Sequence, residues 1–373
     1  MLLKIKTLIK IIIKSKFQFK NPKKRDLVIF DNETFELLEP LCNKYDFFVL
    51  KNRYYQIKEL YISFKILFYI LKNFNRGNFS TIYFSAVISQ IDPKLVLTII
   101  DNSDYFSNVA KILHNKYKFV AIQGAARYEI KQFKKKFFIP EFYCFGDYEE
   151  DLYKKNNSKI NSFISCGSLK QSYYLKSDEF KNDNSKKYDI ALLSEPCPGW
   201  SEKFPLFEET VGKIAQFVLR LVKKNNLKLI FVGKRAENSI LREKEISFYK
   251  RYLNENFFIN PRLKEKFSSY KYTESSELVI GFVSTLLREN LGAGKKILSC
   301  NFTNDERHDF PIDGICNLKD DTYESFEKRV LEIINSSKEN YFEKLNKDKN
   351  YVMRFDPKNT AYDIIENKLN QYL

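Results

Sequence analysis

Residues 272–302 are the part of the sequence that most restricts the fold. Their sequence is YTESSELVIGFVSTLLRENLGAGKKILSCNF, with an apolar run at 278–280, a polar turn, a helical segment at 286–291, a glycine turn and a second apolar run at 296–300. A strand, helix and strand of this length form a βαβ unit, whose strands are parallel and whose crossover is right-handed. The sequence therefore predicts a parallel α/β sheet with a polar turn at the carboxyl end of a strand, where such sheets bind ligands.

The polar turn carries side chains that suit an anion site. Ser284 and Thr285 precede the helical segment and are residues that cap helix N-termini. The free N–H groups and positive dipole end of such a helix favour a phosphate. Glu289 follows Thr285 by one helical turn, within reach of a sugar hydroxyl. These residues predict a site for the phosphate end of a nucleotide; the alternative is an ordinary buried βαβ unit with a capped helix.

Short apolar runs alternate with helical segments along most of the chain, which predicts doubly wound parallel sheets. In the first half, strands are expected at 26–30, 47–50, 81–84, 95–100, 119–122, 142–145 and 163–166, and helices at 59–74 and 106–116. In the second half, strands are expected at 189–193, 227–232, 278–280 and 296–300, and helices at 208–225, 237–254, 286–291, 323–335 and 359–371.

A polar stretch at 176–188 interrupts this pattern and predicts a linker. The 373 residues are enough for two domains. We expect a Rossmann-like domain at 26–176 and a second Rossmann-like domain, with C-terminal helices, at 189–373. A cleft between two such domains is a preferred ligand site.

The first 25 residues carry nine Lys or Arg and no acid, more than half of the net charge of +16. Leu and Ile side chains at 2, 5, 8, 9, 12 and 13 fall near one helical face. We therefore expect residues 1–25 to form a basic amphipathic helix at an anionic membrane surface. A helix docked on the protein body and a secretory signal are the alternatives; lysines interrupt the apolar core that a signal needs. Because the charge is local, nucleic-acid binding is not expected.

Other classes of chemistry are disfavoured. The sequence has no Walker A loop, no GxGxxG after a strand and no GxSxG elbow, and this weakens a dinucleotide oxidoreductase. The six cysteines have no CxxC spacing and only two histidines occur, which fits a reducing cytosol and argues against a zinc site. No acidic pair lies at a clear strand end, so we expect no metal and no cofactor beyond a co-substrate. No apolar run is long enough to predict a transmembrane helix.

Polar residues follow several expected strands and are expected to meet at the cleft. From the first domain they are Asp31, Asp101, Ser103, Gln123, Arg127 and Ser168. From the second domain they are Glu195, Lys234, Arg235, Arg262, Ser284, Thr285 and Glu289.

Together these groups fit the transfer of a sugar from a nucleotide. That reaction requires cations or N–H groups for the departing phosphate, a polar partner for the ribose and a carboxylate for the acceptor proton. Lys234 and Arg235 suit the phosphate. Asp101 is the candidate catalytic carboxylate because it ends a strand of the opposite domain; the alternative is that it caps the helix that begins near residue 105.

The block at 101–175, with DNSDYFSNVAKIL, FVAIQGAARYEI, FIPEFYCFGDYEEDLYKK and FISCGSLKQSYYL, resembles bacterial surface-carbohydrate or O-antigen biosynthesis proteins, as does ELVIGFVSTLLRENLGAGKKIL. These proteins are similar to GT-B-fold glycosyltransferases, including the capsule polymer and CDP-glycerol transferase groups. The resemblance covers about residues 26–320. It implies two Rossmann-like domains facing across a cleft, a nucleotide-sugar donor held mainly by the second domain and no obligatory metal. Some related CMP-sugar enzymes have His-Pro where this chain has Asn260-Pro261.

By position, Ser284, Thr285 and Glu289 match the donor-binding turn and helix of such enzymes. We assign Glu195, Lys234, Arg235 and Arg262 to the donor side as well. The acceptor side takes Ser103, Gln123, Gly124, Arg127 and Ser168.

We therefore expect a metal-independent glycosyltransferase that adds sugar from a nucleotide-sugar to a growing O-antigen or capsule-type polysaccharide. Its partners would be the nucleotide-sugar, a glycan or lipid-linked acceptor and, through residues 1–25, an anionic membrane. Its location would be cytoplasmic, peripheral at the inner face of the membrane. The alternatives are a nucleotide-sugar 2-epimerase-like enzyme and a non-catalytic carbohydrate-assembly protein on the same fold.

Overall fold

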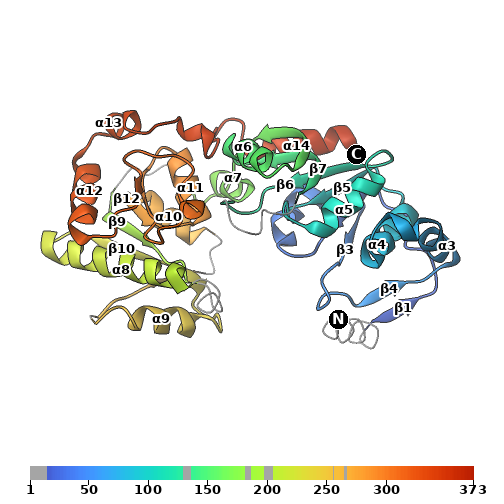
Figure 1. The fold of residues 1–373 in the computed structure, drawn as a ribbon, viewed down its shortest axis with the longest axis horizontal. Coiled ribbons are helices and arrows are strands. Elements are labelled where there is room, and N and C mark those ends of the chain that lie inside the picture. The colour runs from blue at the N-terminus through green and yellow to red at the C-terminus, as the bar shows by residue number, and fades with distance from the viewer. Residues whose placement is uncertain (1–14, 129–135, 181–185, 197–204, 255, 264–266) are drawn as a thin grey trace.

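The protein has two α/β lobes placed side by side along its long axis (Figure 1). The computed structural model describes residues 15–128, 136–180, 186–196, 205–254, 256–263 and 267–373. Each lobe is built on a six-stranded sheet in which every described strand pairing is parallel. The expected α/β class with two Rossmann-like domains is confirmed.

The first lobe has the strand order β3-β2-β5-β6-β7-β8. Its strands are β2 (Leu27–Phe30), β3 (Phe47–Leu50), β5 (Leu95–Thr98), β6 (Lys118–Ile122), β7 (Phe138–Cys144) and β8 (Lys159–Ser165). Its helices are α2 (Glu39–Cys42), α3 (Phe64–Asn73), α4 (Phe79–Ile91), α5 (Asp104–Leu113), α6 (Tyr148–Lys155) and α7 (Leu169–Leu175). Strands β2 and β5 are buried at every position, because core clusters cover both faces of the sheet.

The second lobe has the strand order β11-β10-β9-β12-β13-β14. Its strands are β9 (Tyr188–Leu193), β10 (Leu229–Ala236), β11 (Asn260–Arg262), β12 (Ser276–Gly281), β13 (Lys296–Cys300) and β14 (Asn317–Leu318). Its helices are α8 (Pro205–Asn225), α9 (Arg242–Lys250), α10 (Ser268–Glu274), α11 (Thr285–Gly292), α12 (Tyr323–Asn335) and α13 (Lys338–Glu343).

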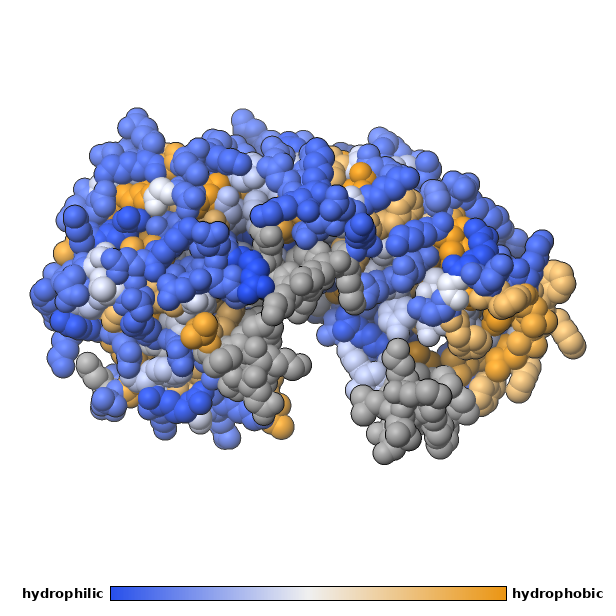
Figure 2. Space-filling view, in the orientation of Figure 1, coloured by the Kyte–Doolittle hydropathy of each residue, from blue (hydrophilic) through white to orange (hydrophobic). Residues whose placement is uncertain are grey.

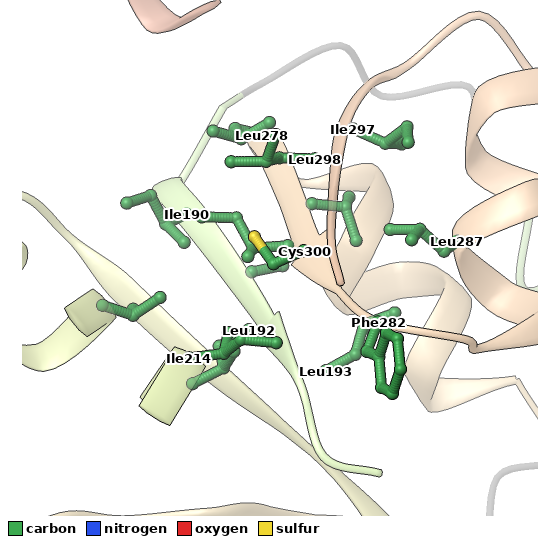
Figure 3. Close-up of a cluster of buried hydrophobic side chains, with 14 of the residues drawn as sticks. Ile190, Leu192, Leu193, Ile214, Leu278, Phe282, Leu287, Ile297, Leu298 and Cys300 are labelled. Carbon is green, nitrogen blue, oxygen red and sulfur yellow. The ribbon is translucent and has the colours of Figure 1, made fainter. Parts of the chain in front are cut away.

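The predicted βαβ unit is confirmed as β12-α11-β13, with Leu278 opposite Lys296 in a parallel pair. Figure 3 shows the core beneath it, where Ile190 of β9 and Leu298 of β13 lie near Leu278. Leu287 of α11 is fully buried against the same cluster. The apolar pattern of this unit therefore serves the packing of a sheet covered by helices.

One expected strand is wrong. Residues 81–84, TIYF, lie within helix α4, which Asn78 caps by accepting a hydrogen bond from Thr81 N at 2.9 Å. The β-branched and aromatic side chains suggested a strand. Ile82, Phe84 and Val87 are instead buried on a helix, so tertiary packing outweighs local propensity. The helix expected at 59–74 is shorter as well, because β4 (Glu59–Tyr61) occupies its start and Ser63 caps α3.

The two ends of the chain also differ from expectation. Most of the helix expected at 1–25 lies outside the described residues, but Lys16–Gln18 forms strand β1, which pairs in parallel with β4. The helix therefore does not extend through residue 25. The linker expected at 176–188 lies partly outside the described residues too.

The last helix belongs to the other lobe. Helix α14 (Ala361–Tyr372) was expected with the second domain, but Ala361, Ile365 and Leu369 pack in the core of the first lobe with Leu27 and Leu95. Lys44 pairs with Glu366 at 2.8 Å. The chain therefore returns to the first lobe at its C-terminus, and the assignment of residues 361–372 to the second domain is corrected.

Candidate functional site

A pocket of about 460 Å³ lies between the two lobes. Its residues follow the carboxyl ends of strands in both sheets, the edge where α/β proteins bind ligands. The first lobe contributes the polar and small residues Gln123, Gly124, Ala125, Ala126, Ser168 and Lys170. The second lobe contributes Ser194, Glu195, Gly233, Lys234, Arg262, Tyr270, Ser284, Thr285 and Glu289. A volume of this size can hold a small organic ligand.

The start of helix α11 forms part of the second-lobe wall. Ser284 is its N-cap and accepts a hydrogen bond from Leu286 N at 3.2 Å. Val283, Ser284, Thr285 and Leu286 all line the pocket. The first-turn N–H groups and the positive end of the helix dipole therefore favour an anion at this wall.

Glu195 shapes the turn that leads into this helix. Its carboxylate accepts hydrogen bonds from Phe282 N at 2.6 Å and Val283 N at 2.9 Å. Burial raises the pKa of Glu195, and these backbone N–H groups oppose that rise. Although Glu195 lines the pocket as predicted, its carboxylate is committed to the backbone between β12 and α11. Its position suits it to hold the turn rather than to contact a donor.

Replacing Glu195 with Gln is expected to lower the free energy of unfolding by about 1–3 kcal/mol. The amide NH₂ would face one of the two backbone N–H groups and leave it without an acceptor. Urea unfolding of the wild type and the variant measures the loss. Glu237→Gln, at an exposed carboxylate of the same lobe, is the matched control. Equal stability of both variants would show that the two backbone bonds contribute little.

Glu289 joins the lobes. It accepts hydrogen bonds from Ser168 Oγ at 2.5 Å and from Tyr270 OH at 2.9 Å, and Gln171 Nε2 donates to its backbone oxygen at 3.0 Å. Burial raises the pKa of Glu289, and the charge of Lys170 opposes that rise. Ser168, Gln171 and Lys170 belong to the first lobe, so this donor-side carboxylate lies at the interface between lobes.

Thr285 makes a second contact of this kind. Its Oγ1 accepts a hydrogen bond from Ala126 N at 2.9 Å. The turn at 284–285 therefore meets the loop after β6 directly, and the pocket wall is continuous from one lobe to the other.

Asp101 does not line the pocket, and the prediction that it faces an acceptor is corrected. It is fully buried in the first lobe, where Arg127 Nε donates to its Oδ2 at 2.9 Å and Tyr153 OH donates to the same oxygen at 2.7 Å. Both side-chain partners satisfy a carboxylate that burial would otherwise penalise. Asp101 and Arg127 therefore form a structural ion pair rather than the catalytic and acceptor-side groups that were expected.

Three further predicted residues lie outside the pocket lining. The first is Asp31, whose Oδ2 accepts a hydrogen bond from Arg53 Nε at 3.0 Å. Ser103 is the N-cap of α5, and its Oγ accepts a hydrogen bond from Phe106 N at 3.3 Å. The alternative role of Asp101 as the cap of this helix is therefore filled by Ser103. Arg235 follows Lys234 on β10, and only Lys234 lines the pocket. Successive side chains on a strand point to opposite faces, which explains the difference.

Gln123 and Gly124 line the pocket, and their contacts hold the loop after β6 in place. The Gln123 amide donates to Ala125 O at 3.0 Å and to Glu149 Oε1 at 2.9 Å, and its oxygen accepts from Phe145 N at 2.8 Å. A Cβ at Gly124 would lie 2.8 Å from Ile99 O, so the loop passes close to the backbone after β5. These residues hold the loop of residues 124–126 against Thr285.

Sequence reasoning missed a buried ion pair beneath this loop. Arg288 Nη1 lies 2.8 Å from Glu149 Oε1, and both side chains are fully buried. Arg288 also donates to Arg127 O, and its guanidinium lies 4.6 Å from the ring centre of Tyr128 and 4.9 Å from that of Tyr148. The sequence alone offers no signal for it, because the partners are 139 residues apart.

Lys170 and Tyr270 were missed at the pocket itself. Lys170 lies two residues after Ser168, with its Nζ 5.8 Å from the ring centre of Tyr270. Its position four residues after the strand expected at 163–166, at the start of α7, was the signal that could have identified it. Within the described residues, no group of three His, Cys, Asp or Glu is placed to hold a metal ion. Independence from metals and cofactors remains a prediction.

No protein-family model and no curated protein matches the sequence. Among solved structures, the Methanocaldococcus jannaschii UDP-GlcNAc 2-epimerase with UDP-GlcNAc and UDP is 13% identical, with a TM-score of 0.51, over 92% of this chain and 99% of that chain. S. aureus MnaA with UDP is 12% identical, with a TM-score of 0.52, over 93% of this chain and 96% of that chain. The wall teichoic acid polymerase TagF is 8% identical over 94% of this chain and 89% of that chain. Its TM-score of 0.43 is too low to support a shared fold. These likenesses establish the fold, which is the expected GT-B-like pair of Rossmann-type domains.

Proposed function

We propose that this chain is a glycosyltransferase that moves sugar from a nucleotide-sugar to a growing bacterial surface polysaccharide at the cytoplasmic face of the membrane. The pocket between the lobes carries the proposal. Its second-lobe wall presents the start of α11 with Lys234 and Arg262, and the first lobe adds Lys170. Helix N-termini and cations are the groups that stabilise a departing phosphate.

The fold supports a nucleotide as the ligand. The M. jannaschii epimerase was solved with UDP-GlcNAc and UDP, and S. aureus MnaA with UDP. In our proposal the phosphates lie at the start of α11, within reach of Lys234 and Arg262. A carboxylate can accept about four hydrogen bonds, so Glu289, which accepts two, retains capacity for ribose hydroxyls.

The acceptor would enter over the first-lobe wall, beside Ser168, Lys170 and the loop of residues 124–126. In the reaction the bond between the anomeric carbon and the phosphate oxygen breaks, and the acceptor oxygen bonds to that carbon. The acceptor hydroxyl gives its proton to the departing phosphate, which is itself a base with a second pKa of about 6. Asp101 has no part in this step.

A nucleotide-sugar 2-epimerase is the second candidate, because the structural similarity to a solved epimerase covers 92% of this chain. Epimerisation moves a proton at a ring carbon and needs a base beside the sugar. Among the described pocket residues the carboxylates are Glu195 and Glu289. Glu195 is held by two backbone N–H groups, and our proposal assigns the remaining capacity of Glu289 to the ribose, so we favour group transfer.

The assay that separates these reactions uses the full chain with UDP-, GDP-, CDP- and CMP-linked sugars. Each donor is incubated with and without lipid-linked glycan acceptor from a bacterial membrane extract. We expect nucleotide release that depends on the acceptor, together with transfer of labelled sugar to it. Inverted configuration at C2 without acceptor, observed by NMR, would establish the epimerase instead. Binding of nucleotide-sugars with neither reaction would favour the non-catalytic alternative.

A further inference from the structure

Helix α3 carries apolar side chains on both of its faces. On the inner face, Ile66, Tyr69 and Ile70 pack against the core of the first lobe. On the outer face, four large side chains are exposed: Phe64 (93%), Leu67 (46%), Phe68 (67%) and Leu71 (72%). Phe74, directly after the helix, is 73% exposed. Apart from Lys65 and Lys72, the helix is apolar on both faces, which is typical of a helix covered on both sides. The outer face therefore calls for a covering partner.

The exposed apolar surface continues onto neighbouring elements. Phe79 at the start of α4 is 66% exposed, and the rings of Phe17 in β1 and Phe19 just after it lie 6.3 Å apart. Strand β1 lies next to the start of α3, because Ile62 N donates to Gln18 O at 2.8 Å. Figure 2 shows this apolar area at the edge of the lobe that carries α3 and α4.

We name this surface the α3 face: Phe17, Phe19, Phe64, Leu67, Phe68, Leu71, Phe74 and Phe79. A contiguous apolar surface of this kind marks a contact with a protein or a membrane. The charge of the residues around the α3 face indicates whether its partner is a protein or a membrane.

The charge around the α3 face selects the partner. Residues 60–91 contain Lys65, Lys72 and Arg76 and no Asp or Glu, and all three cations are exposed. Lys16 and Lys20 add exposed cations at β1, where Glu59 of β4, opposite Lys16, is an exposed acid. A second copy of the chain would bring these cations against each other. Apolar side chains surrounded by cations match the hydrocarbon and anionic headgroups of a lipid bilayer.

We propose that the α3 face docks on an anionic lipid bilayer, with its aromatic and leucine side chains in the interface and Lys65, Lys72 and Arg76 at the headgroups. The α3 face consists of described residues and does not include the basic segment at 1–14. The membrane contact that the sequence predicts for residues 1–25 would reinforce binding through the α3 face. Within the described residues, no helix is long and apolar enough to cross a membrane. The inference does not depend on the reaction in the pocket.

The test is cosedimentation of the full chain with vesicles of phosphatidylcholine alone or mixed with phosphatidylglycerol. We expect binding to the anionic vesicles and at least a roughly tenfold weaker partition for Phe68→Asp/Leu71→Asp, because the substitutions put charge into the apolar contact. The control is Ile240→Asp/Phe258→Asp, which changes two exposed apolar side chains of the second lobe (89% and 71% exposed) and should bind like the wild type. Phe64→Ser/Leu71→Ser repeats the test without adding charge.

Three results would overturn the proposal. The wild type could fail to bind anionic vesicles, or both α3 variants could bind as the wild type does. Light scattering could also show a dimer that the α3 variants disrupt, with vesicle binding unchanged, which would make the face a contact between copies. Unchanged thermal midpoints of the variants would establish that they are folded, as expected for substitutions at exposed positions.

Discussion

Replacing Arg288 with Met is expected to lower the free energy of unfolding by about 3–5 kcal/mol, because it leaves the Glu149 carboxylate buried without its charge partner. The pair joins α11 of the second lobe to α6 of the first, with 2.8 Å between Nη1 and Oε1. Gln123 Nε2 donates to the same carboxylate oxygen at 2.9 Å. Methionine retains much of the volume, so the loss reports on charge and hydrogen bonding. Urea unfolding measures it.

The loss is also expected to depend on pH. Burial raises the pKa of Glu149 above its ordinary 4.5, and Arg288 opposes that rise. Without Arg288 the folded-state pKa rises further, so the folded variant binds a proton more readily than the unfolded chain. Its stability therefore falls as pH increases above the ordinary value. The difference between wild type and variant should be larger at about pH 8 than at about pH 5.

The double variant Glu149→Gln/Arg288→Met is the control for this prediction. It removes both charges, and we expect it to recover much of the stability that the single variant loses, because a neutral replacement leaves no buried ion. A single variant that loses less than about 1 kcal/mol, or a double variant as unstable as the single one, would contradict the role of this pair at the lobe interface.

Replacing Lys234 and Arg262 with Met is expected to weaken nucleotide binding by about 100-fold or more, because a hydrogen bond to a charged group contributes about 1.5–3 kcal/mol. Both residues line the pocket, at the ends of the adjacent parallel strands β10 and β11. Titration calorimetry with the nucleotide that binds the wild type measures the change. Activity in the transfer assay should fall with affinity or by more, since the same cations stabilise the departing phosphate.

Arg235→Met is the matched control, since it removes one cation from the same strand at a residue outside the pocket lining. We expect its affinity to change by no more than about twofold, as for a distant, solvent-screened charge. If Arg235→Met weakened binding as much as Lys234→Met/Arg262→Met, the nucleotide phosphates would lie elsewhere. The sequence assigned both residues to the donor, and this comparison separates them.

Local patterns were the part of the fold that the sequence could predict. The unit β12-α11-β13 follows from its apolar runs and from a capping serine, which act within a few residues. Helix α4 could not be predicted from TIYF, because its β-branched and aromatic side chains are satisfied by burial in the first-lobe core. The place of α14 depends on contacts with residues such as Leu27, at the other end of the chain.

The candidate site also has a part that the sequence could predict and a part that it could not. The sequence correctly predicted that Lys234, Arg262, Ser168 and Ser284 lie at the pocket. They follow strand ends, and the carboxyl ends of parallel strands lie at the same edge of a sheet. Sequence position could not show which polar groups are already engaged. Asp101 is held by Arg127, 26 residues away, and such pairs form only when the sheet brings their strands together.

Hydrogen exchange of the full chain, with and without UDP, GDP, CDP and CMP, tests most directly the central claim that a nucleotide occupies the pocket between the lobes. With at least one of these ligands we predict slower exchange in peptides that contain residues 232–234 and 283–287. The same peptides should lose this protection in the Lys234→Met/Arg262→Met variant. If none of the four ligands slows exchange at these residues, or if protection appears only elsewhere in the chain, the pocket is not a nucleotide site.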